Sequence, residues 1–310
     1  MSEPASVATA GVDNAVIRPA GERDLPGVDR VLDANEPPAA DDAPNPDAFL
    51  AYLGYLLGRG RMLVAELDGS IVAFGTVVDI GPVCHLADLF VAPEHHGRGL
   101  GGRILAEIFE NRWPRSTFSS ADPRALPLYV RAGMAPLWPN LYLDGTADGL
   151  VAELEVRASD ADETSRLEVE FGGVERSDDH AYWANRDGAE PFVVIDAGEI
   201  AAFGHARNRL RKVGRWIERL VLAPGIEDRS AAVVSAVAFA GRVGGAIGLC
   251  VPGPNPLRPC SRRASGSSTR TRTWPANQTC SIRAGTSSTP AFPEAGGLEI
   301  SPRRSRGRAG

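Results

Sequence analysis

The residues that first suggest chemistry form a glycine-rich turn, His96-Gly97-Arg98-Gly99-Leu100-Gly101. The pattern predicts a strand ending at Val91 before this turn and a helix starting near Leu100 after it. Glycines let a backbone approach a ligand closely, and the unpaired N–H groups at the start of a helix attract anions. A pyrophosphate would suit such a turn. The alternative is a strand-to-helix turn that binds nothing.

The segment around the turn extends the pattern. Residues 89–105 read Leu-Phe-Val-Ala-Pro-Glu-His-His-Gly-Arg-Gly-Leu-Gly-Gly-Arg-Ile-Leu. This closely resembles the acetyl-CoA-binding motif of GNAT N-acyltransferases, in which [Q/R]-x-x-G-x-[G/A] follows a Leu-x-Val-x-Pro strand. His96 departs from the motif, because the family has Gln or Arg there. The resemblance implies acetyl-CoA, or another acyl-CoA, as co-substrate. The implied ligand-binding residues are Leu89, Phe90, Val91, His96, Gly97, Arg98, Gly99, Leu100, Gly101, Arg103 and Asp122, with Arg98 and Arg103 adding positive charge near the phosphates.

A second family motif follows downstream. The family pattern Asn-x-x-Ala-x-x-Leu-Tyr-x-x-x-Gly-Phe is matched by Asp122-Pro-Arg-Ala-Leu-Pro-Leu-Tyr129-Val-Arg-Ala-Gly-Met134. Asp122 replaces Asn and Met134 replaces Phe. The resemblance implies that Tyr129 lies near the thiol of CoA and protonates the leaving thiolate as a general acid. The alternative is that Tyr129 is only a core residue of an amphipathic helix.

The reaction implied by the resemblance is direct attack of an amine on a thioester. It needs a base for the ammonium group, which in the family is a carboxylate or histidine on the strand before the turn, acting through water. Asp88 and His85 are the candidates, and Asp88 is preferred, although it could also be a solvent-facing strand residue. The acceptor is expected to be a small-molecule or peptide amine, and no metal is expected. A noncatalytic acyl-CoA-binding sensor and an inactive structural pseudoenzyme are the alternative functions.

The elements around these motifs predict an α+β domain over residues 15–146, after a disordered N-terminus at 1–14. Asp68-Gly69 is a hairpin turn signal between two apolar runs. The predicted sheet is mixed, mostly antiparallel, and flanked by helices. Its predicted strands are 16–18, 62–67, 71–79, 83–91, 117–119 and 141–143, and its predicted helices are 22–34, 47–57, 100–110 and 125–132.

The fold is predicted to be duplicated in tandem, with a second GNAT-like domain over residues 147–258. Residues 64–75 resemble residues 193–204, and Leu-Phe-Val-Ala-Pro at 89–93 resembles Leu-Val-Leu-Ala-Pro at 220–224. The second copy carries Glu227 and Asp228 where the phosphates would lie. Two acids there would repel a pyrophosphate, so this copy is predicted to be degenerate. If the residues after 258 are frameshifted, its last helix and strand are also missing and the copy is truncated.

Residues 259–310 change abruptly to a composition rich in Ser, Arg, Thr and Pro. One interpretation is a low-complexity, disordered tail. The other is a frameshift, because one codon choice for residues 259–265 reads Leu-Leu-Glu-Ala-Gly-Phe in a neighbouring frame. The DNA sequence of the gene would distinguish the two.

Composition excludes several classes of protein. The chain has 310 residues, enough for about two domains. Its net charge of -6 argues against nucleic acid and anionic membranes as partners. Its four cysteines show no C-x-x-C spacing, which predicts reduced thiols. Without a signal-like or membrane-spanning segment, a cytoplasmic protein is expected. A homodimer is left open as the assembly.

Overall fold

The protein is described by a computed structural model that covers residues 12–37, 45–210, 212–252 and 278–284. The chain divides into two compact units. The first comprises Met1–Pro136, Leu210–Val213 and Cys280–Thr289, and the second comprises Leu137–Arg209, Gly214–Thr279 and Pro290–Gly310. The predicted disorder of residues 1–14 and the two interpretations of 259–310 concern mainly residues outside this description. They stay predictions.

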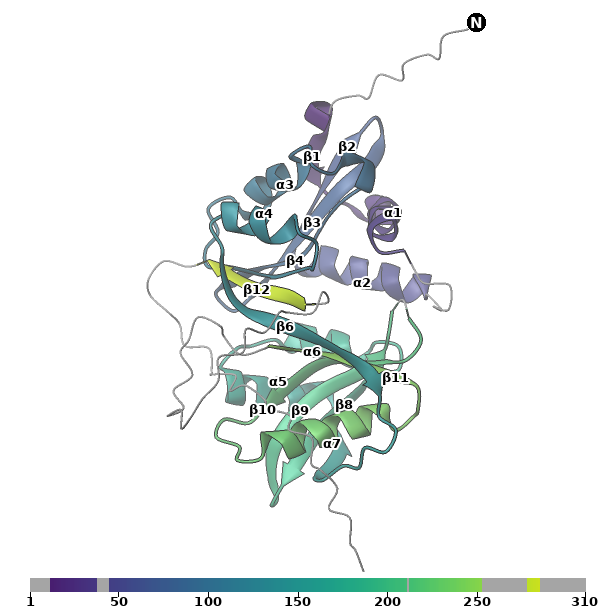
Figure 1. Ribbon diagram of the computed structural model, residues 1–310, viewed down its shortest axis with the longest axis vertical. Helices are drawn as coiled ribbons and strands as arrows, with labels where there is room; N and C mark the ends of the chain where they lie inside the picture. Colours follow the sequence, from purple (N-terminus) through teal and green to yellow (C-terminus); the bar gives the residue numbers. More distant parts are fainter. Residues whose placement is uncertain (1–11, 38–44, 211, 253–277, 285–310) are drawn as a thin grey trace, which may run out of the picture. The chain divides into compact units, whose positions relative to one another are not determined.

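The first unit is a twisted sheet with helices on both faces (Figure 1). Its strands lie in the order β1-β2-β3-β4-β5-β12, and all neighbours are antiparallel except the parallel pair β4 and β5. The strands are β1 (Val16–Pro19), β2 (Arg61–Leu67), β3 (Ser70–Ile80), β4 (Val83–Val91), β5 (Arg115–Ser119) and β12 (Gln278–Ala284). The helices are α1 (Leu25–Asn35), α2 (Pro46–Arg59), α3 (Leu100–Phe109) and α4 (Ala125–Arg131), with short 3-10 turns at Val12–Asn14, Glu22–Asp24 and Pro93–His95.

Local sequence explains where these elements begin and turn. Asp68 and Gly69 both have positive φ, 50° and 77°, as the tight turn between β2 and β3 requires. Asn45 caps α2 by accepting a hydrogen bond from the Ala48 backbone N–H at 3.1 Å, and Pro46 fills the first helical position. The predicted hairpin and the predicted second helix are therefore both present.

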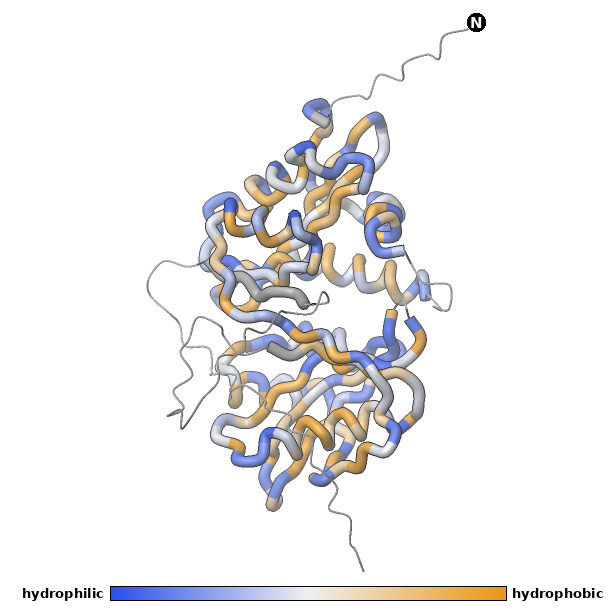
Figure 2. The backbone as a smooth tube through the Cα atoms, viewed as in Figure 1, coloured by the Kyte–Doolittle hydropathy of each residue, from blue (hydrophilic) through white to orange (hydrophobic). Residues whose placement is uncertain are grey.

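Each face of the first sheet has its own apolar layer. Val64 and Phe74 pack under α1 and α2 with Leu53, while Leu86 packs with Ile108 under α3 and α4. Successive side chains of a strand point to opposite faces, and because both faces are covered by helices the strands are mainly apolar (Figure 2). The mixed α+β sheet flanked by helices that the sequence predicts is confirmed.

The second unit repeats this order of elements. Its sheet runs β6-β11-β10-β9-β8-β7, and the parallel pair is β10 and β11. Its strands are β6 (Ala135–Thr146), β7 (Glu155–Ala158), β8 (Glu190–Asp196), β9 (Glu199–Asn208), β10 (Arg215–Leu222) and β11 (Ala246–Pro252). Its helices are α5 (Ala161–Gly172), α6 (Ser177–Ala184) and α7 (Arg229–Gly241).

Strand register shows how closely the two units correspond. In the first unit Gly75 lies opposite Leu89, and in the second unit Gly204 lies opposite Leu220. These are the same positions of the sequence repeat. Each unit also has one extra residue in the strand before the turn, Ala87 in β4 and Glu218 in β10. The correspondence between the two units thus extends to a β-bulge that the sequence did not reveal.

The structure shows which strand pairs with the strand after α4, a pairing that the sequence did not reveal. The sequence predicts a strand at residues 141–143 that closes the first domain before a boundary at 146. In the structure, β6 pairs antiparallel with β11 from Asn140 to Thr146, and the division between the units falls after Pro136. The position next to β5 is taken by β12 instead, with Cys280 opposite Ser119. Strand pairing between residues so far apart in sequence has no local signal.

Candidate active site

A bulge in β4 opens the sheet at the candidate site. Ala87 and Asp88 together lie opposite Thr76, because the register with β3 shifts there. On the other side of β4, the described parallel ladder with β5 covers only Cys84 to Leu86. Beyond Leu86 the described ladder with β5 ends, which leaves backbone groups of residues 87–90 on that side for an extended ligand.

The predicted ligand-binding residues Leu89 and Phe90 use their side chains for packing. Leu89 packs on the α3 side of the sheet, and Phe90 stacks on Phe74 with ring centroids 5.6 Å apart. Their backbone groups are therefore the parts that could bind a ligand. This agrees with a role for the main chain of β4 rather than its side chains.

His96 ties the glycine turn to the end of β4. Its Nε2 lies 2.6 Å from the Val91 carbonyl oxygen. Because a carbonyl only accepts, Nε2 carries the proton and donates it. Asn35 Nδ2 also donates to this oxygen, at 2.9 Å. The histidine that departs from the family motif therefore holds the turn in place, while the Val91 carbonyl is already occupied.

The turn itself has the geometry expected of an anion site. Gly97 and Gly99 have φ of 75° and 82°, a region in which residues with a Cβ are strained. Gly99 precedes Leu100, the first residue of α3, and no side chain caps this helix. The N–H groups of its first turn are thus left for a ligand.

The two predicted arginines differ in the structure. Arg98 is exposed on the turn, where its charge can act on an anion. Arg103 instead donates from Nη2 to the Ala15 carbonyl at 2.8 Å and so holds the start of the described chain against α3. Its predicted contact with a phosphate stays a prediction.

The corresponding turn of the second unit is closed by its own side chain. Asp228 precedes α7, and its Oδ1 accepts a hydrogen bond from the Ala231 backbone N–H at 2.9 Å. The carboxylate thus satisfies one of the helix N–H groups that an anion would need, and it adds a negative charge. The N-terminus of α3 thus has no side-chain cap, whereas the N-terminus of α7 is capped by Asp228.

Asp88 lies at the bulge and faces α2. Tyr52 donates to Asp88 Oδ2 at 3.4 Å. The pKa of Asp88 is raised to about 6, mainly by burial and to a smaller extent by the charge of Glu36, while the hydrogen bond from Tyr52 opposes the rise. A carboxylate with a pKa near 6 is mostly ionised at neutral pH yet remains a better proton acceptor than an ordinary aspartate.

Tyr129 is buried on α4 and lies within electrostatic reach of Asp88. Burial raises the pKa of Tyr129 to about 12, a hydrogen bond with Thr117 lowers it, and the charges of Asp88 and Asp122 add to the rise. The phenol therefore keeps its proton throughout the neutral range. Tyr129 also packs in the core with Met134, so it is both a core residue and a group that carries a proton at neutral pH.

His85, the other predicted base, has a different setting. Its Nδ1 lies 2.9 Å from Ser116 Oγ, and its ring meets Phe118 edge-on at 5.3 Å. His85 belongs to the part of β4 that is still paired with β5, before the bulge. Asp88, at the bulge, is the better placed of the two candidates.

Asp122 lies near the glycine turn but is engaged locally. Its Oδ1 accepts from the Arg124 backbone N–H at 2.8 Å and from Arg124 Nε at 2.9 Å. This contact lowers the pKa of Asp122, and the charge of His96 lowers it further. The residue thus shapes the loop before α4 as an ion pair.

Two residues of the site were missed by sequence reasoning. Tyr52 reaches Asp88 from α2, and Thr76 lies directly across the strand pair from Asp88. The Thr76 side chain is fully buried, and its Oγ1 has no hydrogen-bond partner. Neither has a local signal, because a tyrosine in an amphipathic helix and a threonine in a strand are both common.

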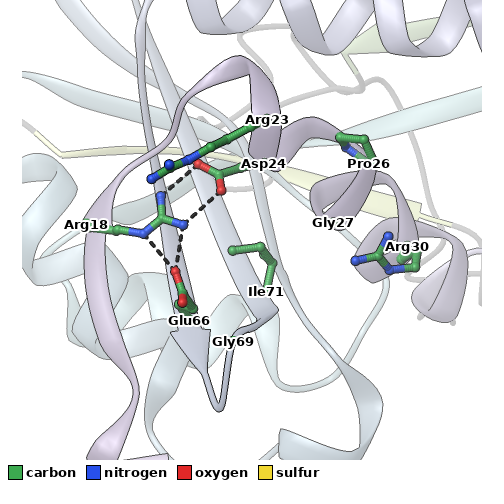
Figure 3. Close-up of a pocket in the computed structure, with 9 residues that line it drawn as sticks. All are labelled: Arg18, Arg23, Asp24, Pro26, Gly27, Arg30, Glu66, Gly69 and Ile71. Carbon is green, nitrogen blue, oxygen red and sulfur yellow. Dashed lines mark hydrogen bonds and ion pairs between the residues drawn. The ribbon is translucent and has the colours of Figure 1, made fainter.

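The surface hollow of Figure 3 lies elsewhere and contains none of the predicted site residues. It has a volume of about 420 Å³. Its floor is an ion-pair network in which Arg18 donates to both carboxylate oxygens of Asp24, at 2.7 and 2.8 Å, and to Glu66. The network joins β1, β2 and the turn before α1, and we interpret it as structural.

The second unit carries different groups at the two key strand positions. Register places His205 where the first unit has Thr76, and Arg219 where it has Asp88. Arg219 forms an ion pair with Glu168. A cation thus stands where the first unit has its candidate base.

These residues belong to a buried polar cluster. His180 Nδ1 lies 2.9 Å from His205 Nε2, and both nitrogens lie near Thr164 Oγ1, at 3.0 and 3.1 Å. His180 Nε2 is 3.5 Å from Glu168 Oε2. The cluster fills the α5 and α6 side of the second sheet with side chains that bond to one another.

Two features are absent from the described residues. Among them, no group of three or more His, Cys, Asp or Glu could hold a metal ion. No helix within the described ranges has both the length and the apolar character needed to cross a membrane.

Comparison with known proteins agrees with this geometry. Residues 58–133 match the family described as acetyltransferase (GNAT) domain, a range that includes the bulge, the glycine turn and Tyr129. The fold is that of the GNAT superfamily. A putative acetyltransferase from Pyrococcus horikoshii is similar over 90% of this chain and 92% of its own, at 14% identity and a TM-score of 0.63.

Two other GNAT structures extend over both units of this chain. A GCN5-related N-acetyltransferase from Sphaerobacter thermophilus has 18% identity and a TM-score of 0.57, covering 88% of this chain and 96% of its own. A tandem GNAT protein from the clavulanic acid biosynthesis pathway has 11% identity and a TM-score of 0.53, covering 89% and 100%. At these identities the likeness concerns the fold. No curated protein matches the chain.

Proposed function

We propose that the first unit is an N-acyltransferase that moves an acetyl or similar acyl group from acyl-CoA to an amine. The observation that carries the proposal is Asp88, which lies at the β4 bulge with a raised pKa, together with Tyr129, a buried phenol that keeps its proton at neutral pH. The uncapped start of α3 next to Gly99 supports it, because such a turn suits the pyrophosphate of CoA. The match of residues 58–133 to the GNAT domain supports it independently.

The residues have separate tasks in this reaction. Acyl-CoA, when bound, supplies a thioester carbonyl as the electrophile. Asp88 accepts a proton from the acceptor ammonium, so that the neutral nitrogen can attack. Tyr129 donates its proton to the departing sulfur, and the phenol is restored from solvent. The free backbone of β4 beyond Leu86 would hold and orient the donor beside these two groups.

We infer that the second unit is a degenerate GNAT copy that binds no acyl-CoA and catalyses no transfer. Three differences support this: Asp228 caps the helix that would bind phosphate, Arg219 replaces the base, and His205 takes part in a buried cluster. The tandem GNAT protein among similar structures supports the two-copy organisation.

Two glycines with the same backbone conformation, one in the turn before α3 and one in the turn before α7, provide a matched test. Gly99 and Gly225 have φ of 82° and 81°, and a Cβ on either would meet no atom within 4 Å. Alanine therefore imposes a similar backbone strain at both positions. Isothermal titration of the full chain with acetyl-CoA should show weaker binding by Gly99→Ala and unchanged binding by Gly225→Ala.

Amine-dependent release of CoA, measured with a thiol reagent over a panel of primary amines, tests the transfer itself. Release that is lost in Asp88→Asn would support the proposal. Tight acetyl-CoA binding without amine-dependent release would indicate the noncatalytic sensor. A folded chain that binds no acetyl-CoA would indicate the structural pseudoenzyme.

A further inference from the structure

In both units a helix side chain contacts the residue that follows the bulge. In the first unit the Tyr52 hydroxyl of α2 donates to Asp88 Oδ2 at 3.4 Å. In the second unit register places Arg219 at this position, and its Nε donates to Glu168 Oε2 of α5 at 2.9 Å. The partner in the first unit is a neutral hydroxyl, whereas the partner in the second unit is a charged carboxylate.

Tyr52 is fixed by packing as well as by its hydrogen bond. It lies on α2 between Phe49 and Leu56, two residues that the helix buries. Its ring contacts the ring of Phe49, with centroids 5.9 Å apart, and belongs to the apolar layer under α1 and α2. A tyrosine packed through its ring presents its hydroxyl as the polar end. In this unit that end reaches the strand β4 at Asp88.

The two carboxylate oxygens of Asp88 have different surroundings. Oδ2 accepts the hydrogen bond from Tyr52, whereas Oδ1 has no hydrogen-bond partner among the described residues. The side chain is partly exposed, so a ligand can approach it. In the second unit both oxygens of Glu168 bond to Arg219. The first unit therefore keeps one carboxylate oxygen available at this position, and the second unit does not.

We propose that Tyr52 is a positioning residue that holds Asp88 Oδ2, so that Oδ1 is left to take the proton of the acceptor ammonium. This inference rests on the function proposed above. The proton passes from the ammonium nitrogen to Oδ1, and the nitrogen keeps the electron pair with which it attacks the thioester carbonyl. Tyr52 keeps its own proton and acts only through Asp88.

The hydrogen bond from Tyr52 also affects the charge of Asp88. It favours the ionised carboxylate and lowers the pKa of Asp88, while burial and the charge of Glu36 raise that pKa. Thr76, which lies opposite on β3, carries no charge, and the phenol of Tyr129 on α4 keeps its proton at neutral pH. Loss of the Tyr52 hydroxyl should therefore raise the pKa of Asp88.

The pH dependence of acyl transfer by the full chain tests the proposal. Tyr52→Phe removes the hydroxyl and keeps the packed ring. Because a hydrogen bond to a charged group contributes about one pKa unit or more, the acid limb of kcat/KM for the acceptor should move upward by about one pH unit. The limb then lies near pH 7 instead of about 6, and kcat/KM at pH 6 should fall about fivefold.

A second measurement separates position from charge. At about pH 8.5 Asp88 is ionised in both proteins, so a remaining loss of kcat/KM in Tyr52→Phe reports the lost orientation of the carboxylate. An acid limb that stays in place, or equal values of kcat/KM at about pH 8.5, would overturn the proposal. Tyr55→Phe makes the same change three residues later on α2 and should leave the whole profile unchanged. An equal shift in this control would also overturn the proposal.

Failure of this inference can be told apart from failure of the proposed function. An NMR titration of the labelled carboxyl carbon of Asp88, assigned by its loss in Asp88→Asn, requires no acceptor and no turnover. A pKa of Asp88 near 6 that rises in Tyr52→Phe but not in Tyr55→Phe supports the contact, even if no CoA is released from acetyl-CoA. A pKa that is the same in the wild type and Tyr52→Phe overturns the inference. Amine-dependent CoA release that is lost in Asp88→Asn would then leave the transferase intact.

Discussion

Acidification should destabilise the second unit through His205. Its side chain is 1% exposed, and burial lowers its pKa to about 3, with the charges of His180 and Arg219 lowering it further and Glu168 opposing. The folded protein therefore keeps His205 neutral, whereas the unfolded chain protonates it below its ordinary pKa of about 6.5. Because the unfolded state binds the additional proton, stability is lost as the pH falls from about 6.5 toward 3.

The size of the effect follows from these two pKa values. Each pH unit between them is worth about 1.4 kcal/mol. At pH 5, about 1.5 units below the unfolded pKa, His205 should lower the free energy of unfolding by about 2 kcal/mol relative to pH 7.5. This is a large share of the ~5–15 kcal/mol that stabilises a typical domain.

The prediction is measured by hydrogen exchange with mass spectrometry at pH 7.5 and pH 5, corrected for the intrinsic exchange rate at each pH. Peptides from β9 and β10 report on the second unit alone. His205→Gln is the test variant, because its amide can still donate toward His180 but does not titrate. His95→Gln, in the first unit, is the control.

The wild-type chain and the control should lose about 2 kcal/mol more protection in β9 and β10 on acidification than His205→Gln does. An equal loss in His205→Gln would refute the reasoning. It would mean that His205 does not remain neutral in the folded unit and that the cluster adapts to a proton.

Three further predictions concern the turn and the reacting groups. The kcat/KM for acceptor should fall as the pH drops through about 6, where Asp88 becomes protonated, and a pH–rate profile without a limb in that region would contradict its role as the base. Tyr129→Phe should lower kcat about 100-fold, the usual size of a general-acid contribution, while acetyl-CoA binding measured by calorimetry stays the same; an unchanged kcat would exclude Tyr129 as the acid. Asp228→Ala should weaken exchange protection of α7 by about 1 kcal/mol through loss of its cap, and full protection would show that the Ala231 N–H needs no side-chain partner.

Much of the fold could be predicted because its signals are local. The turn at Asp68-Gly69, the glycines at 97 and 99 and the amphipathic α3 each depend on a few neighbouring residues. The similar order of elements in the two units could be predicted because residues 64–75 and 193–204 keep the same pattern. The helix cap formed by Asp228 could also have been predicted, because Asp228 lies three residues before Ala231. The sequence-based prediction used only the negative charge of Asp228, as a source of repulsion toward pyrophosphate.

The sequence alone predicted which unit would bind acyl-CoA, because glycines and acids at a helix start act on the backbone N–H groups of their own turn. The tertiary structure decided what surrounds the reacting groups. Only pairing of β3 with β4 brings Thr76 opposite Asp88, and only packing of α2 brings Tyr52 to the same carboxylate. Burial then raises the pKa of Asp88, an effect that depends on groups distant in the chain. The pairing of β6 with β11 also depends on the tertiary structure, because long-range strand pairing is determined by the whole sheet and not by the residues of one strand.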